Sequence, residues 1–398
     1  MLKPAWLNRN VIGMTVTSLL SDACYEMVLA VLPGFLPIVG ISAAALGWIE
    51  GVSDGFSSTL KLVAGWWTDR VGHRKRLVTA GYFFTGTGLS LFALAHAWPV
   101  ILAGRMVSWI GKGMRGSLRD AMLSESVPSE VRGKAFGFHR AGDTIGAILG
   151  PLMGAFLLHF LPSQPLDFAF RRIFTLSLIP GLLAPPAFFL LVRETRKVAK
   201  PHLSIWSALG QLPLRFRHFL MAVGLFGSGD FSPTLLILAA ATLLGPRFGA
   251  VRSAELAALF YVLRNIVYSA ASFPIGAMGD HFRKRTLLGI GYGAAGLTAA
   301  GVAWMFWLHS TNLYALGSLF LLSGIFASAQ DTMEGAIPPE LTPPELRGTT
   351  YGTLGLVNGA GDFIASALLG TLWSLASPVI AFAVAATLML SGAVMVAL

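Results

Sequence analysis

The sequence predicts an all-helical, polytopic membrane protein with about twelve transmembrane helices in two pseudo-symmetric six-helix bundles. Three observations carry this prediction. The 398-residue chain is 55% hydrophobic and 12% charged, whereas soluble domains usually carry about 25% charged residues. Apolar runs long enough to cross a hydrocarbon core of about 30 Å recur along the chain. Finally, two motifs of the first half recur in the second half. Lipid is therefore the expected surroundings of most helices.

Composition and motifs also limit the functional class. The formal net charge of +10 would suit nucleic-acid binding in a soluble protein, but beside apolar runs it indicates orientation in the bilayer. The single cysteine, Cys24, excludes a disulfide within the chain and offers no thiolate metal cluster. No GxxxxGK[ST], HExxH or CxxC run occurs, and no GxSxG lies between a strand and a helix. We therefore expect no enzyme, no cofactor, no metal site and no nucleic-acid partner.

The predicted spans follow the apolar runs in order. They cover residues 11–39, 44–68, 77–96, 98–120, 135–161, 172–192, 218–245, 255–279, 286–308, 313–336, 348–374 and 378–398. The first run is too long for a signal peptide and should remain in the mature protein. Residues 363–398 carry no charge, and Ser377-Pro378 is their most plausible turn. Without that turn, eleven spans would remain.

Lysine and arginine gather in alternate connections. One side of the membrane collects Lys3, Arg9, the run "DRVGHRKR" at 69–76, Arg132, Lys134, the segment 193–217, Arg283 to Arg285 and Arg347, whereas the other has only Arg171, Arg172, Arg247 and Arg252. Cytoplasmic connections usually hold the excess of bases. Both termini are therefore expected in the cytoplasm, with the chain in the inner (plasma) membrane.

An internal repeat relates the two halves. "GWWTDRVGHRKRL" at Gly65 recurs as "GAMGDHFRKRTLL" at Gly276, and "VPSEVRGKAFGF" at 127 recurs as "TPPELRGTTYGT" at 342. The two matches have nearly the same offset. They predict an N-terminal bundle at 1–192, a basic cytoplasmic central loop at 193–217 and a C-terminal bundle at 218–398. Secondary transporters are commonly built from such repeats.

The first of these motifs carries a family resemblance. Gly65-x-x-x-Asp69-Arg70-x-Gly72-x-Arg74-Lys75 resembles the signature between the second and third helices of the major facilitator superfamily. The resemblance implies a fold of six plus six helices, a monomer, and a conformational latch on the cytoplasmic side. Its candidates are Gly65, Asp69, Arg70, Gly72 and Arg74, with Asp280 in the second copy. There Arg283 stands where a glycine is expected.

Glycines mark the fifth span, "GDTIGAILGPLMG". Gly142, Gly146 and Gly150 are spaced by four, so they share one helix face that another helix can approach closely, and Pro151 and Gly154 follow. One interpretation is a general packing face. The other is a resemblance to the antiporter signature of drug/proton exchangers in the superfamily, which would favour efflux.

Acids inside the spans need a partner or a function because charge in the membrane is costly. Asp22 and Glu26 lie four apart in the first span, and Asp230 is the nearest counterpart in the second half. Burial and a neighbouring acid both favour proton uptake by a carboxyl group. These three residues are the candidates for proton coupling, and the alternative for each is a structural ion pair or hydrogen bond. Further acids are Asp331, Glu334 and Asp362.

Other charges within the spans are candidates for a substrate cavity. They are Glu50, Asp54, Arg105, Arg140, Asp143 and Arg264. Arg105 resembles an arginine of the fourth helix in the superfamily, although the spacing to the following glycines differs. "FGFHRAGD" at 136–143 places His139 and Arg140 within one turn of Asp143. Together with Arg115, Arg119 and Asp120 across the preceding connection, it predicts either an interfacial salt-bridge cluster that supports the latch or a site for an anionic group, which arginine binds through two parallel hydrogen bonds.

These features lead to one expected function and its alternatives. We expect a secondary transporter that moves a small solute by alternating access, with proton-coupled efflux as the first hypothesis. The alternatives are proton-coupled uptake and export of an anionic metabolite, siderophore or metal complex. The expected partners are a small-molecule substrate, protons and the lipid bilayer.

Overall fold

The computed structural model describes residues 7–71, 74–128, 132–161, 164–194, 212–342 and 347–398. Every regular element in these ranges is a helix, and the predicted all-helical fold is confirmed. The chain divides into two compact units. Unit 1 comprises Met1–Gly40 and Phe56–Pro201, and unit 2 comprises Ile41–Gly55 and His202–Leu398. The second helix therefore contributes residues to both units.

Unit 1 contains the helices of the first predicted half. They are α1 (Arg9–Phe35), the later part of α2 (Ala43–Val71), α3 (Lys75–Ser90) with the 3-10 turn η1 (Leu91–Leu94), α4 (Trp98–Glu125), α5 (Arg132–Phe160), α6 (Phe168–Leu176) and α7 (Leu178–Leu191). The side chain of Asn8 caps α1 by accepting a hydrogen bond from the Val11 N–H. The predicted sixth span is two helices interrupted at Ser177, since Pro180 cannot donate a backbone hydrogen bond one turn back.

Unit 2 contains the early part of α2 and the helices of the second half. These are α9 (Leu214–Gly227), α10 (Pro233–Phe248), α11 (Ala250–His281), α12 (Lys284–Trp307), α13 (Leu313–Ala336), α14 (Pro338–Leu341), α15 (Arg347–Leu375) and α16 (Pro378–Ala397). The predicted seventh span is broken at residues 228–232, where Gly229 and Pro233 disfavour a continuous helix. The apolar stretch at the C-terminal end does turn at Ser377, whose side chain caps α16.

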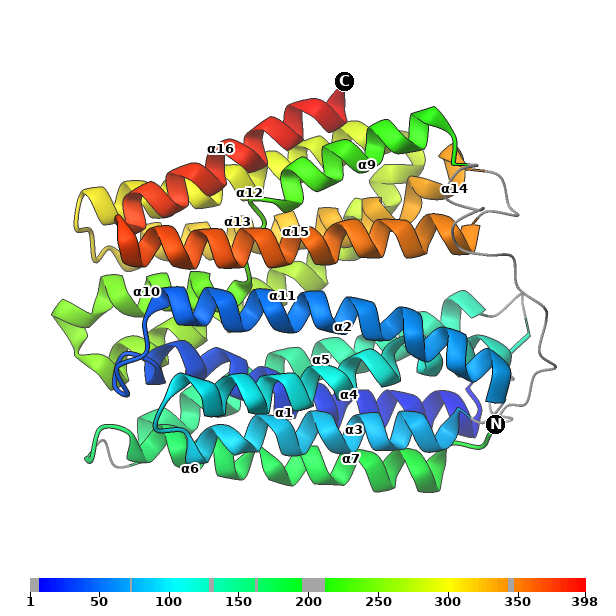
Figure 1. Cartoon of the computed structure of the whole chain (residues 1–398), viewed down its shortest axis with the longest axis horizontal. Coiled ribbons are helices and arrows are strands. Elements are labelled where there is room, and N and C mark those ends of the chain that lie inside the picture. Colours follow the sequence, from blue (N-terminus) through cyan, green and yellow to red (C-terminus); the bar gives the residue numbers. More distant parts are fainter. Residues whose placement is uncertain (1–6, 72–73, 129–131, 162–163, 195–211, 343–346) are drawn as a thin grey trace. The chain divides into compact units, whose positions relative to one another are not determined.

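Corresponding helices have corresponding neighbours in the two units. In unit 1, α1 packs on α5 and α7, and α3 packs on α4 and α7. In unit 2, α9 packs on α15 and α16, and α12 packs on α13 and α16. Figure 1 shows α16 running beside α12, and α3 beside α7. This shared pattern is what a duplicated bundle would produce.

Nine helical stretches in the described part of the chain are long and apolar enough to cross a membrane. Helix α4 has 28 residues and ample length, but it carries Arg105, Lys112, Arg115 and Arg119. A transmembrane helix with four bases must direct them toward protein or water rather than toward lipid. The charges of α4 are therefore central to the candidate site.

Glycines set the separation between α1 and α5. An added Cβ at Gly146 would lie 2.6 Å from the Leu19 carbonyl oxygen, and one at Gly150 would lie 2.7 Å from that of Ala23. Gly142 and Gly154 also lie against α1. Because Asp22 and Glu26 occupy this part of α1, the close approach brings the backbone of α5 to the two acids singled out in the first span.

Candidate functional site

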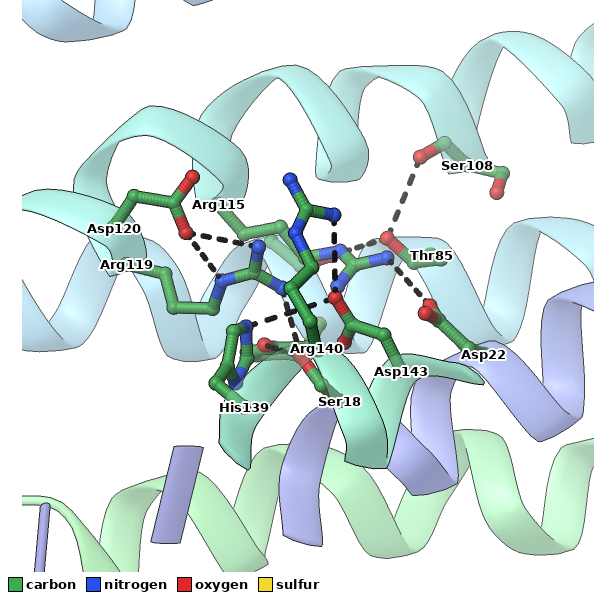
Figure 2. Close-up of polar contacts among 12 residues, drawn as sticks. Ser18, Asp22, Thr85, Ser108, Arg115, Arg119, Asp120, His139, Arg140 and Asp143 are labelled. Atoms are coloured by element: carbon green, nitrogen blue, oxygen red, sulfur yellow. Dashed lines mark hydrogen bonds and ion pairs between the residues drawn. The ribbon is translucent and has the colours of Figure 1, made fainter. Parts of the chain in front are cut away.

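Charged side chains from α1, α4 and α5 meet inside unit 1. We call the set the α4 charge cluster. It comprises Ser18, Asp22, Arg115, Arg119, Asp120, His139, Arg140 and Asp143 (Figure 2). Of these, Asp22, Arg140 and Asp143 were singled out by the sequence. Arg115, Arg119 and Asp120 of α4 were expected to form a salt-bridge cluster with the 136–143 segment, and the fold shows which partner each side chain reaches.

Asp22 forms an ion pair with Arg115 near the middle of α1. The Arg115 Nη2 lies 3.6 Å from the Asp22 Oδ1, and the two side chains are 6% and 24% exposed, respectively. The Arg115 guanidinium also lies over the Tyr82 ring, 4.6 Å from its centre. The separation of 3.6 Å between Arg115 and Asp22 is longer than that of a good charge-assisted hydrogen bond. Asp22 is therefore paired loosely and keeps partial access from outside the protein interior.

Arg119 is held more tightly. Its Nη1 donates to the Ser18 hydroxyl at 2.7 Å, while Nε and Nη2 donate to the Asp120 Oδ1 at 3.1 and 2.9 Å. The side chain is nearly buried and the Asp120 side chain is 40% exposed. Arg119 thus joins α4 to α1 and has a fixed counter-ion, unlike Arg115.

Asp143 lies between a histidine and an arginine on the same turn of α5. The His139 Nε2 is 3.8 Å and the Arg140 Nη1 is 3.6 Å from the Asp143 Oδ2. His139 is 1% exposed, and neither of its ring nitrogens has a hydrogen bond. The Arg140 side chain is 70% exposed. Of the two charged candidates from this segment, Asp143 belongs to the interior and Arg140 faces outward.

A second group of cations on α4 is packed against aromatic rings. The Arg105 guanidinium lies 3.8 Å from the centre of the Trp109 ring, and the Lys112 Nζ lies 4.7 Å from the same ring and 4.9 Å from that of Tyr25. Arg105 is fully buried. Because positions 105, 112, 115 and 119 are spaced by seven, three and four, these bases share one face of the helix.

In unit 2, the broken seventh span brings Asp230 to α13. The Gln330 Nε2 donates to the Asp230 Oδ2 at 3.0 Å. One turn further along α13, Glu334 accepts hydrogen bonds from the Tyr292 hydroxyl at 2.5 Å and from the Asn358 amide at 2.6 Å. The sequence did not single out Tyr292 or Asn358, because each is a lone polar residue in an apolar run.

The remaining charged candidates have separate surroundings. The Glu50 side chain is buried within unit 2 and accepts a hydrogen bond from the Ser232 hydroxyl at 3.0 Å. Asp54 is half-buried on α2. Arg264 donates to the Ser323 hydroxyl and to the Asn265 side chain, at 3.1 Å each. Glu50, Asp54 and Arg264 all belong to unit 2.

Among the proposed latch residues, Arg74 has side-chain contacts within the described part of the chain. Gly72 and the side chains of Asp69, Arg70 and Asp280 lie outside the described residues, as do the side-chain surroundings at Gly65. Arg74 forms an ion pair with Glu125 at 2.8 Å. The Glu194 carboxylate accepts hydrogen bonds from the backbone N–H groups of Arg74 and Lys75, at 3.2 and 3.0 Å. The first turn of α3 is thereby tied to the end of α4 and to the chain after α7.

Comparisons with known proteins agree with this architecture. The family model of the Major Facilitator Superfamily matches residues 14–260 and 221–398. An uncharacterized MFS-type transporter of Methanocaldococcus jannaschii is 29% identical over 381 residues, which cover 94% of this chain and 91% of that protein. A probable 4-methylmuconolactone transporter of Cupriavidus pinatubonensis is 29% identical over 158 residues, which cover 40% of this chain and 36% of that one.

Solved structures show the same fold at low sequence identity. A bacterial homolog of the human lysosomal transporter Spinster, inward-facing and unoccupied, has a TM-score of 0.73 at 16% identity, covering 100% of this chain and 95% of that one. The nucleoside transporter NupG has a TM-score of 0.77 at 12% identity, covering 97% and 98%. The relatives are transporters, in agreement with the expectation that this protein is not an enzyme. With the family model covering nearly the whole sequence, the chain belongs to the Major Facilitator Superfamily and is a secondary transporter of that type.

Proposed function

We propose that this transporter couples export of a small solute to proton entry, with Asp22 as the exchange site. The observation that carries the proposal is the loose ion pair between Asp22 and Arg115 in the middle of a spanning helix. A proton on Asp22 would abolish its attraction for Arg115, and loss of the proton would restore it. One carboxylate can therefore exchange a proton for a cationic group of the cargo.

The close approach of α5 offers a mechanical link. The Cβ positions at Gly146 and Gly150 would fall 3.1 Å from the Asp22 Cβ and 3.0 Å from the Glu26 Cβ, respectively. Packed helices have few arrangements between which they can move. A change in the pairing of Asp22 would thus bias how α1 sits on α5. This supports Asp22 and Glu26 as coupling residues and agrees with the glycine pattern that favours efflux.

A second function is supported by the base-rich face of α4. Arg105, Lys112, Arg115 and Arg119 lie on one side of that helix, and arginine is well suited to carboxylate and phosphate. This face favours an organic anion as cargo, carried out of or into the cell with protons. The anion would then bind beside protonated Asp22 rather than replace the proton.

The proposal includes the arrangement of the chain in the membrane. Two duplicated bundles, at 1–192 and 218–398, would give alternating access across the inner membrane, with both termini and the basic segment 193–217 on its cytoplasmic side. The uneven distribution of bases supports this orientation. The contacts of Arg74 support a latch at the start of α3. The family resemblance supports a monomer.

The test is proton flux in proteoliposomes that contain a pH-sensitive dye. A proton gradient is imposed, and either ethidium, an organic cation, or benzoate, an organic anion, is added. We expect one probe to dissipate the gradient with the wild-type protein and not with Asp22→Asn. Asp167→Asn is the matched control, because Asp167 also pairs with an arginine but precedes α6 and lies outside the α4 charge cluster.

The outcomes separate the candidates. Flux with ethidium supports proton-coupled exchange, and flux with benzoate supports the anion carrier. Full flux in Asp22→Asn would show that Asp22 does not carry the coupled proton. Movement of either probe without proton flux would refute proton coupling and leave a facilitator.

A further inference from the structure

Glu334 is a buried carboxyl group that forms no ion pair with any base in the described part of unit 2. It is 5% exposed and lies in the spanning helix α13. Its Oε1 accepts from the Tyr292 hydroxyl and its Oε2 from the Asn358 amide. Tyr292 is fully buried and stacks on Phe226, with ring centres 3.5 Å apart. Both donors are neutral, and the Phe226 ring covers one face of the Tyr292 ring.

The charged groups near Glu334 do not compensate its charge. Asp331 on α13 and Asp230 before α10 are also acids, and each lies close enough to Glu334 for their negative charges to repel one another. Arg264 of α11 donates to Ser323 and Asn265. Among the described residues, no ion pair includes Glu334. A buried carboxylate without a counter-ion is very costly, and the usual solution is to bind a proton.

The hydrogen bonds of Glu334 suit both protonation states. As a carboxylate, it accepts from Tyr292 and Asn358, as any ionised carboxyl can. As a carboxylic acid, it can donate to the Tyr292 oxygen, because a phenol is both donor and acceptor. A change in the protonation state of Glu334 therefore requires only rotation of the Tyr292 hydroxyl hydrogen, and no heavy atom has to move.

We propose that Glu334 is a proton-binding group of unit 2, with Tyr292 and Asn358 as positioning residues. The proposal rests on the proton coupling proposed above and adds a second, chemically different site to Asp22. Gln330 bonds to Asp230 and also contacts the Glu334 carboxyl, which links the site to the break between α9 and α10. A proton fits better than a metal ion, because no group of three potential metal-ligating side chains occurs within the described residues.

Infrared titration tests the site without any substrate. The full-length protein in lipid nanodiscs is titrated with acid while the C=O stretch of protonated carboxyl groups is recorded. We expect Glu334→Gln to remove one titrating band that the wild type shows. Glu255→Gln is the control, because Glu255 is a buried acid of the same unit that has an arginine partner, Arg252. Identical titrations of Glu334→Gln and wild type would overturn the proposal.

A second variant keeps the test decisive if Glu334→Gln does not fold. Tyr292→Phe retains the carboxyl group and removes a donor that stabilises its ionised form. A hydrogen bond to a charged group is worth about 1.5–3 kcal/mol, so the band midpoint should rise by roughly 1–2 pH units. An unchanged midpoint would refute the role of Tyr292. A band that Tyr292→Phe leaves untouched cannot belong to Glu334 as described.

A transport assay distinguishes a failure of this proposal from a failure of the proposed function. With whichever of ethidium or benzoate drives proton flux in the wild type, Glu334→Gln should lose flux driven by the proton gradient but retain exchange of labelled probe at equal pH. Full gradient-driven flux in Glu334→Gln would show that its proton is not coupled to transport. Absence of proton flux in the wild type would instead refute the proposed coupling, while the infrared titration would still decide whether Glu334 binds a proton.

Discussion

The packing of α5 on α1 makes a quantitative prediction for Gly146→Ala. The new Cβ would lie 2.6 Å from the Leu19 carbonyl oxygen, 3.1 Å from the Ala23 nitrogen and 3.1 Å from the Asp22 Cβ. Ordinary contacts between non-bonded heavy atoms begin at about 3.5 Å. The shortest contact joins the new Cβ, which is bonded to the α5 backbone, to a backbone oxygen of α1. Neither atom can move away by a side-chain rotation, so the two helices must separate by close to 1 Å.

The expected loss of stability follows from two opposing effects. Forcing an extra methyl group into a packed interior costs about 1–3 kcal/mol. Replacing glycine by alanine in a helix returns about 0.5–1 kcal/mol. The net destabilisation is about 0–2.5 kcal/mol, and at about 2–4 °C per kcal/mol for a unit of this size the Tm should fall by up to about 10 °C. Gly146→Val, which adds two more carbons, should lower it further.

The protein carries its own reporter for this measurement. Cys24 is the single cysteine and is buried in α1, where its Sγ lies against Gly181 of α7. A thiol-reactive fluorogenic dye therefore reports unfolding during heating in detergent. Gly116→Ala is the control, because an added Cβ there meets no atom within 4 Å. A Tm for Gly146→Val no lower than that of the wild type, alongside an unchanged Tm for Gly116→Ala, would refute the close approach of α1 and α5.

Two further predictions concern single contacts. Trp109→Ala should lower the Tm more than Trp109→Phe. It leaves a cavity, which costs about 3–5 kcal/mol, and it removes the ring that faces buried Arg105, which costs up to about 2 kcal/mol. Equal Tm losses for the two variants, measured by the reactivity of Cys24 during heating, would contradict this. Arg171 donates to Asp167 and lowers the pKa of that carboxyl group, so their pairing stabilises the fold above the unfolded pKa of about 3.9 and is lost as the pH falls through the folded value. The small Tm advantage of wild type over Asp167→Asn should therefore be present at pH 7 and disappear in strong acid, and a gap that does not depend on pH would contradict the assignment.

Hydropathy predicted where helices occur better than where they break. The apolar runs gave the spans because each crossing needs a long stretch without exposed polar groups. A sliding average does not register the interruption at Ser177, nor the non-helical residues 228–232 that carry Asp230. Local geometry at proline and glycine decides those breaks. They matter here because the second one brings Asp230 to α13.

The candidate residues were easier to identify than their partners. Asp22 stood out in the sequence as an acid in an apolar run, but its partner Arg115 lies on another helix. Glu334 was one of several acids in the later spans, and its donors Tyr292 and Asn358 are 42 and 24 residues away. Periodicity describes one helix at a time, whereas the identity of a partner depends on how helices pack. The chemistry of each acid, paired with a base or with neutral donors, therefore emerges only from the fold.

Charge balance in the α4 charge cluster links the sign of the cargo to the direction of proton movement. The acids Asp22, Asp120 and Asp143 form ion pairs with the bases Arg115, Arg119 and Arg140, respectively, so these three pairs carry no net charge. A proton on Asp22 leaves one positive charge in excess. A cationic cargo would add to that excess and must therefore take the place of the proton, which is exchange. An anionic cargo would cancel it and must arrive together with the proton, which is cotransport. The response to ethidium or benzoate therefore predicts the coupling mode. Cotransport of ethidium with a proton would show that Asp22 is not the site where charge is balanced.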